Sequence, residues 1–238
     1  KKVKNGDVKV EYVKLLNFMS SRMSKVELKK MTHQLFMLSE SFAPYRDWQE
    51  KGYPKRPIKD LYLGGTPLNA AIVTAMDLLP KFKSETGVQK VNTIFLTDGA
   101  SNSIHDRFHV YKRDGQINNG QQGIGYGTQI FTDVKSGNKV SSKDYKGYSC
   151  QTKMLLALLK MKMPDTNIVN FFVAGSGRKG TVNYNAVRDV VDYDLVQSYR
   201  EMQNLVKKCN KENVLIVPKG QGFDVTYILP GPNKFEMN

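Results

Sequence analysis

The chain has 238 residues, 40% of them hydrophobic, which is enough to fill the core of one sizeable α/β domain or two small ones. Its formal net charge of +14 favours anionic partners, although the lysines and arginines are scattered along the sequence rather than gathered in a tail. The sequence lacks the run of about eighteen apolar residues that a membrane span needs, so we expect no membrane-spanning segment. Cys150 and Cys209 lie far apart and do not imply a disulfide framework. We therefore expect a cytoplasmic protein.

Two helices are predicted near the N-terminus. Apolar residues fall near helical spacing between Glu11 and Met23, and the pattern from Ser24 to Glu27 is that of a capping box. The helix after this box has apolar positions as far as Phe42. The segment from Pro44 to Asp60 then predicts a loop whose aromatic residues cover the core or stack on a partner or nucleobase.

The stretch from Tyr62 to Asn102 organises the rest of the chain. Gly64 and Gly65 allow a tight turn, Thr66 stands where a helix N-cap would, and Pro67 suits the first helical position. The helix then continues with apolar residues at helical spacing: Leu68, Ala71, Ile72, Ala75, Met76 and Leu79.

A strand follows this helix and ends at an acidic residue. The apolar run from Val91 to Leu96 predicts a strand that is buried on both faces, as in parallel sheets, and Asp98-Gly99 comes directly after it. A hydroxyl at a helix start and a carboxylate at the end of a strand suit a hard cation in the crevice of an open α/β sheet. Thr66 and Asp98 are therefore the predicted metal ligands.

The next segment, residues 101–145, is predicted to be a polar insertion. Ser101 to Tyr126 is predicted to be a glycine-rich loop that holds His105, Asp106, His109 and Asp114, and Gln129 to Val140 predicts a β-hairpin. Two histidines at i and i+4 can bind zinc from one helix face, but His105 to His109 lacks the glutamate of a His-Glu-x-x-His protease motif.

The C-terminal half completes an α/β pattern. We predict a helix from Gln151 to Met161, a buried strand from Ile168 to Ala174, and one long helix from Tyr184 to Cys209. A strand at Val214 to Val217 would pair with Phe223 to Leu229. Gly175 to Gly180 lacks nucleotide-binding spacing and is interpreted as another loop at the carboxyl edge of the sheet.

The order of these motifs resembles that of von Willebrand factor A domains. GGTPL followed by FLTDG is similar to the second and third parts of that family's metal-ion-dependent adhesion site, where Thr66 and Asp98 match the family's threonine and aspartate. From about Tyr12 to Phe172 the chain looks like the von Willebrand A proteins of large tailed bacteriophages, which are often labelled "peptidase" and are similar to a cobaltochelatase subunit. The family's first motif, Asp-x-Ser-x-Ser, does not occur in the sequence.

The resemblance implies a fold and a binding function. The fold would be a three-layer, doubly wound, mostly parallel α/β sheet, von Willebrand A-like or Rossmann-like, formed by a single domain over residues 1–238 with an inserted hairpin. The cofactor would be Mg²⁺, or Mn²⁺ or Ca²⁺, with its remaining ligands on an Asp-x-Ser-x-Ser strand that we expect upstream of Lys1.

The implied partner is a protein that offers an acidic residue, such as a MoxR-type AAA+ ATPase in the cytoplasm of a phage-infected bacterium. Two alternatives remain open. The first is a basic structural or virion-associated phage protein that binds nucleic acid through the +14 charge. The second is a metal-dependent peptidase, for which the sequence shows no catalytic constellation.

Overall fold

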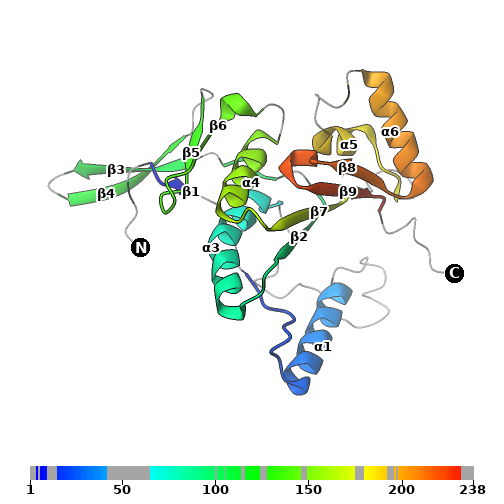
Figure 1. Ribbon diagram of the computed structural model, residues 1–238, viewed down its shortest axis with the longest axis horizontal. Coiled ribbons are helices and arrows are strands. Elements are labelled where there is room, and N and C mark those ends of the chain that lie inside the picture. Colours follow the sequence, from blue (N-terminus) through cyan, green and yellow to red (C-terminus); the bar gives the residue numbers. More distant parts are fainter. Residues whose placement is uncertain are drawn as a thin grey trace. The chain divides into compact units, whose positions relative to one another are not determined.

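A computed structural model describes residues 4, 6–9, 15–41, 65–99, 101–104, 106–113, 116–123, 128–145, 149–174, 180–191, 196 and 198–231. The chain divides into two compact units, one made of Lys1–Tyr12 and Gly65–Asn238 and the other of Val13–Gly64. The fold is α/β, with helices and a mostly parallel mixed sheet (Figure 1). The single domain over residues 1–238 stays a prediction.

The smaller unit contains helix α1, Lys25–Ser41. The predicted capping box is confirmed, because the Ser24 amide donates to Glu27 Oε2 at 2.8 Å and the Glu27 amide donates to Ser24 Oγ at 3.3 Å. The helix predicted between Glu11 and Met23 is wrong where the structure describes it, because residues 15–23 are not helical. There, Ser20 Oγ accepts from the Arg22 amide, a local bond that competes with helix formation. The predicted loop from Pro44 to Asp60 lies outside the described residues.

The larger unit is built on a four-stranded sheet. Its order is β2 (Asn92–Thr97), β7 (Asn167–Val173), β9 (Val225–Leu229) and β8 (Leu215–Pro218). The first three strands are parallel, and β8 runs antiparallel to β9, which confirms the predicted C-terminal pairing. The carboxyl ends of β2, β7 and β9 therefore meet at one edge.

Four helices of the larger unit contribute to the core: α3 (Leu68–Thr86), α4 (Cys150–Lys162), α5 (Tyr184–Val190) and α6 (Tyr199–Glu212). The single helix predicted from Tyr184 to Cys209 is wrong, because α5 ends at Val190 and α6 begins at Tyr199. A new N-cap starts α6, where Ser198 Oγ accepts from the Glu201 amide at 3.2 Å.

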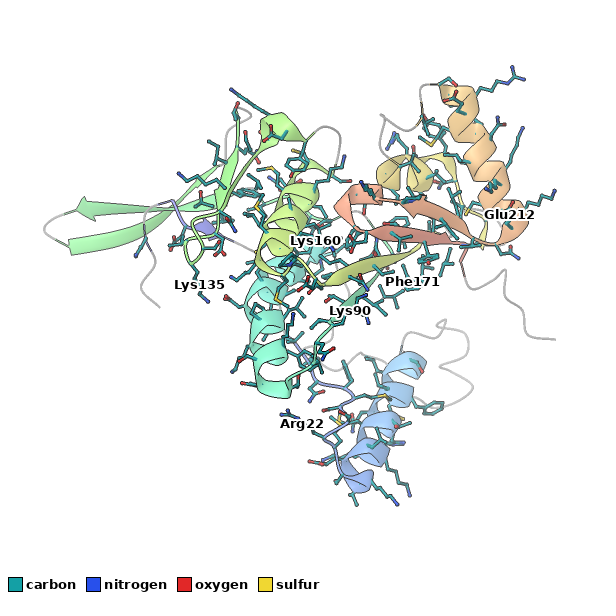
Figure 2. All side chains as sticks on the ribbon, viewed as in Figure 1. Arg22, Lys90, Lys135, Lys160, Phe171 and Glu212 are labelled. Carbon is teal, nitrogen blue, oxygen red and sulfur yellow. The ribbon has the colours of Figure 1, made fainter. Side chains whose placement is uncertain are left out.

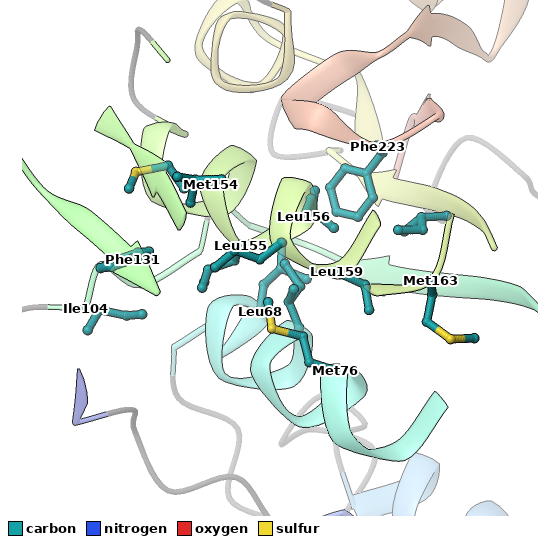
Figure 3. Close-up of a cluster of buried hydrophobic side chains, with 14 of the residues drawn as sticks. Leu68, Met76, Ile104, Phe131, Met154, Leu155, Leu156, Leu159, Met163 and Phe223 are labelled. Carbon is teal, nitrogen blue, oxygen red and sulfur yellow. The ribbon is translucent and has the colours of Figure 1, made fainter. Parts of the chain in front are cut away.

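Both parts of the hydrophobic core lie on the same face of the sheet. Ile168 and Phe172 project from the same side of β7, since side chains alternate along a strand, and each joins one core cluster. In the first cluster, α4 residues such as Leu156 and Leu159 pack among α3 and Phe223 (Figure 3). In the second, β8 and β9 pack with α5 and α6.

The opposite face of the sheet is apolar but uncovered within the described residues of the larger unit. Leu96 is 73% exposed, so among the described residues this strand is buried on one face and not on both as predicted. Leu96 pairs with Phe171, whose ring stacks on Tyr227 with centroids 5.0 Å apart, and Figure 2 labels Phe171 on β7. We call this surface the open face; its apolar residues are Ile94, Leu96, Val169, Phe171, Val173, Ile216, Val225, Tyr227 and Leu229.

The insertion forms two separate hairpins. The predicted loop from Ser101 to Tyr126 is wrong over most of its length, because β3 (Asp106–Arg113) pairs with β4 (Gln116–Gly123), and β1 (Val8–Lys9) joins β3. The second predicted hairpin is confirmed as β5 (Ile130–Thr132) and β6 (Lys139–Ser141). The described residues of the unit also include the short 3₁₀ helices Ser142–Asp144 and Gly220–Gly222.

Candidate functional site

Thr66 lies immediately before the start of α3 but does not cap it. The helix begins at Leu68 with Pro67 at the N-cap position, and that position makes no side-chain cap bond. The predicted capping role of Thr66 is therefore wrong. A backbone amide in the first turn of α3 finds its acceptor in the loop after β2 instead: the Asn69 amide donates to Ser101 Oγ at 2.9 Å.

The turn before α3 and the loop after β2 are in direct contact. The Asn102 amide donates to the Thr66 carbonyl oxygen at 3.0 Å. A Cβ on Gly99 would lie 2.8 Å from Thr66 Oγ1, and a Cβ on Gly65 would lie 2.7 Å from Asn102 Nδ2. A larger residue at either position would therefore displace the Thr66 or Asn102 side chain, and Gly65 also has a positive φ of 79°, which favours glycine.

Asp98 lies at the carboxyl edge of the sheet, as predicted. It follows Thr97, the last residue of β2, whose hydroxyl donates to Asn170 Oδ1 on β7 at 3.4 Å. This bond ties the end of β2 to its neighbour, and the Asp98 side chain itself is exposed to solvent. The structure therefore brings Thr66 beside Gly99, the residue next to Asp98, from segments about thirty residues apart.

A buried polar network holds the loop after β2. Asn69 Nδ2 donates to the Asn102 carbonyl oxygen at 2.9 Å, and Asn69 Oδ1 accepts from Thr152 Oγ1 at 2.8 Å. Asn69 is only 3% exposed and Thr152 only 4%. On the adjacent position of α4, Gln151 both accepts from the Ile104 amide at 2.7 Å and donates to the Ile104 carbonyl oxygen at 3.0 Å.

Sequence reasoning did not single out these network residues. The available signal was weak: an asparagine in the first turn of an apolar helix, and a Gln-Thr pair in the first turn of another. Each is ordinary at a helix start, where polar residues often satisfy backbone groups. Their roles depend on contacts between residues as many as 83 positions apart. The spacing of apolar residues along the sequence does not predict such contacts.

The residues of the alternative zinc motif, which the sequence did not favour, do not form a helical pair. Asp106 and His109 lie in strand β3, so the spacing that places i and i+4 on one helix face does not apply there. His105, Asp114 and the loop from residue 175 to residue 179 lie outside the described residues. Among the side chains that the structure describes, no three of His, Cys, Asp or Glu gather closely enough to hold a metal ion.

The donors at the carboxyl edge fit part of a hard-cation site. Thr66 offers a hydroxyl oxygen and Asp98 an exposed carboxylate, and both are ligand types that Mg²⁺ accepts. Mg²⁺ takes about six oxygens and usually retains several waters, so one or two protein ligands are an ordinary contribution. A carboxylate and a hydroxyl with an exposed edge beside them can hold a cation and leave positions for a partner's oxygen.

No protein-family model matches the chain, and no curated protein or solved structure matches it. Within the part of the chain that the structure describes, none of the helices combines the length and the apolar character that crossing a membrane requires.

Proposed function

We propose that the protein is a cation-dependent protein-binding module of the von Willebrand A type. Thr66 and Asp98 would supply ligands to Mg²⁺, or to Mn²⁺ or Ca²⁺, and an acidic side chain of a partner would complete the coordination shell. The single observation that carries this proposal is the contact between the Thr66 hydroxyl and Gly99 at the carboxyl edge of the sheet. It supports the proposal because the two predicted ligands belong to segments that approach each other closely.

The proposal extends to the fold. A three-layer, doubly wound domain needs helices on both faces of its sheet. The core clusters occupy one face, and the open face carries Ile94 and Leu96 in an exposed apolar surface that a second helical layer would cover. In a doubly wound sheet the carboxyl ends of the strands form the binding crevice, and the position of Asp98 directly after the end of β2 supports a site there.

The proposed cellular role is that of an adaptor. By resemblance to von Willebrand A proteins of the chelatase type, the partner would be a MoxR-type AAA+ ATPase in a phage-infected bacterium, and the chain would present a substrate to it. The acidic residue on the partner would bind only when the cation is present. Removing the cation with a chelator should therefore release the partner.

Calorimetric titration with MgCl₂ and MnCl₂ tests whether the chain binds a divalent cation through Thr66 and Asp98. We expect saturable binding to the wild-type chain, lost or greatly weakened in Asp98→Asn and Thr66→Ala. Asp144→Asn, an exposed carboxylate on the 3₁₀ helix after β6, is the matched control and should bind as wild type does. Equal binding by all four proteins, or none by the wild type, would contradict the proposed function.

The partner arm uses capture on an immobilised MoxR-type ATPase. We expect capture in MgCl₂ that is lost in EDTA and lost in Asp98→Asn. Binding that is indifferent to Asp98 and to EDTA but falls steeply with salt would instead favour attraction through the +14 charge. That result would replace the adaptor with the nucleic-acid-associated alternative.

A further inference from the structure

The two segments that carry Thr66 and Asp98 are joined by one buried side chain. Asn69 lies three residues after Thr66, and its side-chain amide donates to the carbonyl oxygen of Asn102, four residues after Asp98. The backbone amide of Asn69 also donates to Ser101 Oγ. The turn before α3 and the loop after β2 are therefore held together at the same residue.

Thr152 sets the orientation of that amide. Its hydroxyl donates to Asn69 Oδ1 at 2.8 Å, so Nδ2 faces the Asn102 carbonyl oxygen. A flipped amide would place Oδ1 against that carbonyl, where two acceptors would meet without a proton between them. Because both side chains are almost fully buried, water cannot substitute for the lost bond without entering the core.

We propose that Asn69 and Thr152 are positioning residues for the cation site, with Thr152 fixing the Asn69 amide and Asn69 fixing the loop that carries Asp98. This inference rests on the proposed function, since it concerns the same site. Residues that orient metal ligands through hydrogen bonds commonly change metal affinity when they are replaced, although they do not touch the ion. In this proposal neither side chain contacts the ion.

The test pairs two substitutions at one position. Thr152→Val removes the hydroxyl with little change of shape, and Thr152→Ser keeps it. Thr226→Val is the matched control, because Thr226 is also fully buried and its hydroxyl donates to a backbone carbonyl, that of Gly220 at 3.0 Å, outside the loop after β2. Thermal unfolding of all three variants measures their stability separately from binding.

We expect Thr152→Val to weaken Mn²⁺ binding about tenfold or more, whereas Thr152→Ser and Thr226→Val bind as wild type does. Asn69→Ala should behave like Thr152→Val, since it removes the side chain but keeps the backbone bond to Ser101. Equal Mn²⁺ affinities in Thr152→Val and Thr226→Val, at equal stability, would overturn the positioning role and leave the proposed function standing.

A second readout needs no metal. The Asn102 amide donates to the Thr66 carbonyl oxygen, so its hydrogen-exchange rate reports the contact between the two segments. We expect faster exchange at Asn102 in Thr152→Val but not in Thr152→Ser. If the wild type bound no Mn²⁺, the proposed function and the positioning role would fail together, whereas unchanged exchange at Asn102 in Thr152→Val, with Mn²⁺ binding intact in the wild type, would overturn the positioning role alone.

Discussion

The hydroxyl oxygen of Thr66 lies 2.8 Å from the position that a Cβ on Gly99 would occupy. Gly99→Ala would therefore push Thr66 out of place, because real Cβ atoms do not approach an oxygen so closely. We expect Gly99→Ala to weaken Mn²⁺ binding about tenfold through the displaced hydroxyl. Calorimetric titration measures this change.

The control for this prediction is a double-mutant cycle with Thr66→Ala. Once the hydroxyl is gone, a methyl group at Gly99 has little left to displace, so Gly99→Ala should add little to the effect of Thr66→Ala. Strictly additive losses would mean that Gly99 acts on the site by a route other than Thr66.

The open face gives a prediction about the proposed three-layer fold. If a helical layer covers Leu96 in the intact protein, Leu96→Asn should lower the free energy of unfolding by about 1–3 kcal/mol, through lost apolar burial and an unpaired amide. Val134→Asn, at a 77% exposed position in the β5–β6 turn, is the control and should cost about 0.5 kcal/mol or less. Chemical denaturation that gives equal values for both would contradict the second layer.

The turn between β5 and β6 is anchored to α4 by an ion pair. Asp133 Oδ2 lies 3.2 Å from Lys162 Nζ, and the side chains are only 13% and 16% exposed. Burial would raise the pKa of Asp133, but hydrogen bonds from Ser136 and the Lys135 amide, together with the Lys162 charge, outweigh it and lower that pKa below its ordinary value. Asp133 is therefore stabilising as the carboxylate.

The lowered pKa of Asp133 determines how its contribution to stability changes with pH. A carboxyl group with a lowered pKa in the folded state contributes stability above its unfolded pKa, about 4, and loses it as the pH falls through the folded value. Asp133→Asn should thus cost about 1–3 kcal/mol at pH 7, and the difference from wild type should shrink in acid. Glu85→Gln, in the exposed pair with Lys81, should cost about 0.5 kcal/mol or less. A pH-independent Asp133→Asn effect would contradict the account.

Both cysteines should react slowly with alkylating reagents in the folded protein. Burial raises the pKa of the Cys150 thiol, only partly opposed by Lys153, so little thiolate forms at neutral pH. Cys209 is fully buried. We expect iodoacetamide labelling at pH 7.5 to be slow for both thiols and to become rapid in guanidinium chloride. Rapid native labelling at Cys150 would place it in a more open environment than the structure shows.

Local patterns predicted the parts of the fold that rest on local physics. The apolar runs before Asp98 and before Gly175 are the parallel strands β2 and β7, and the capping box at Ser24 starts α1. The pattern failed at β4, which is rich in Gln, Asn and Gly and has low strand propensity, yet pairs along its whole length with β3. Pairing across a hairpin overrode propensity there.

In the candidate site, too, the features set by local sequence could be predicted and those set by long-range contacts could not. The positions of Thr66 and Asp98 at the carboxyl edge could be predicted because each belongs to a motif at the end of its own element. The Ser101 contact with α3 and the Thr152 contact with Asn69 could not, since they join residues 32 and 83 positions apart and leave no periodic trace. Buried polar pairs of this kind depend on tertiary packing.

The most direct test of the central claim is paramagnetic line broadening by Mn²⁺ on the isotopically labelled chain. Bound Mn²⁺ broadens the amide signals closest to it, so the experiment locates the ion without assuming its ligands. We predict that the amides of Thr66, Asp98 and Gly99 broaden first and that Asp98→Asn removes this effect. Broadening centred on the strand that holds His109, or none at any amide, would contradict a cation site formed by Thr66 and Asp98.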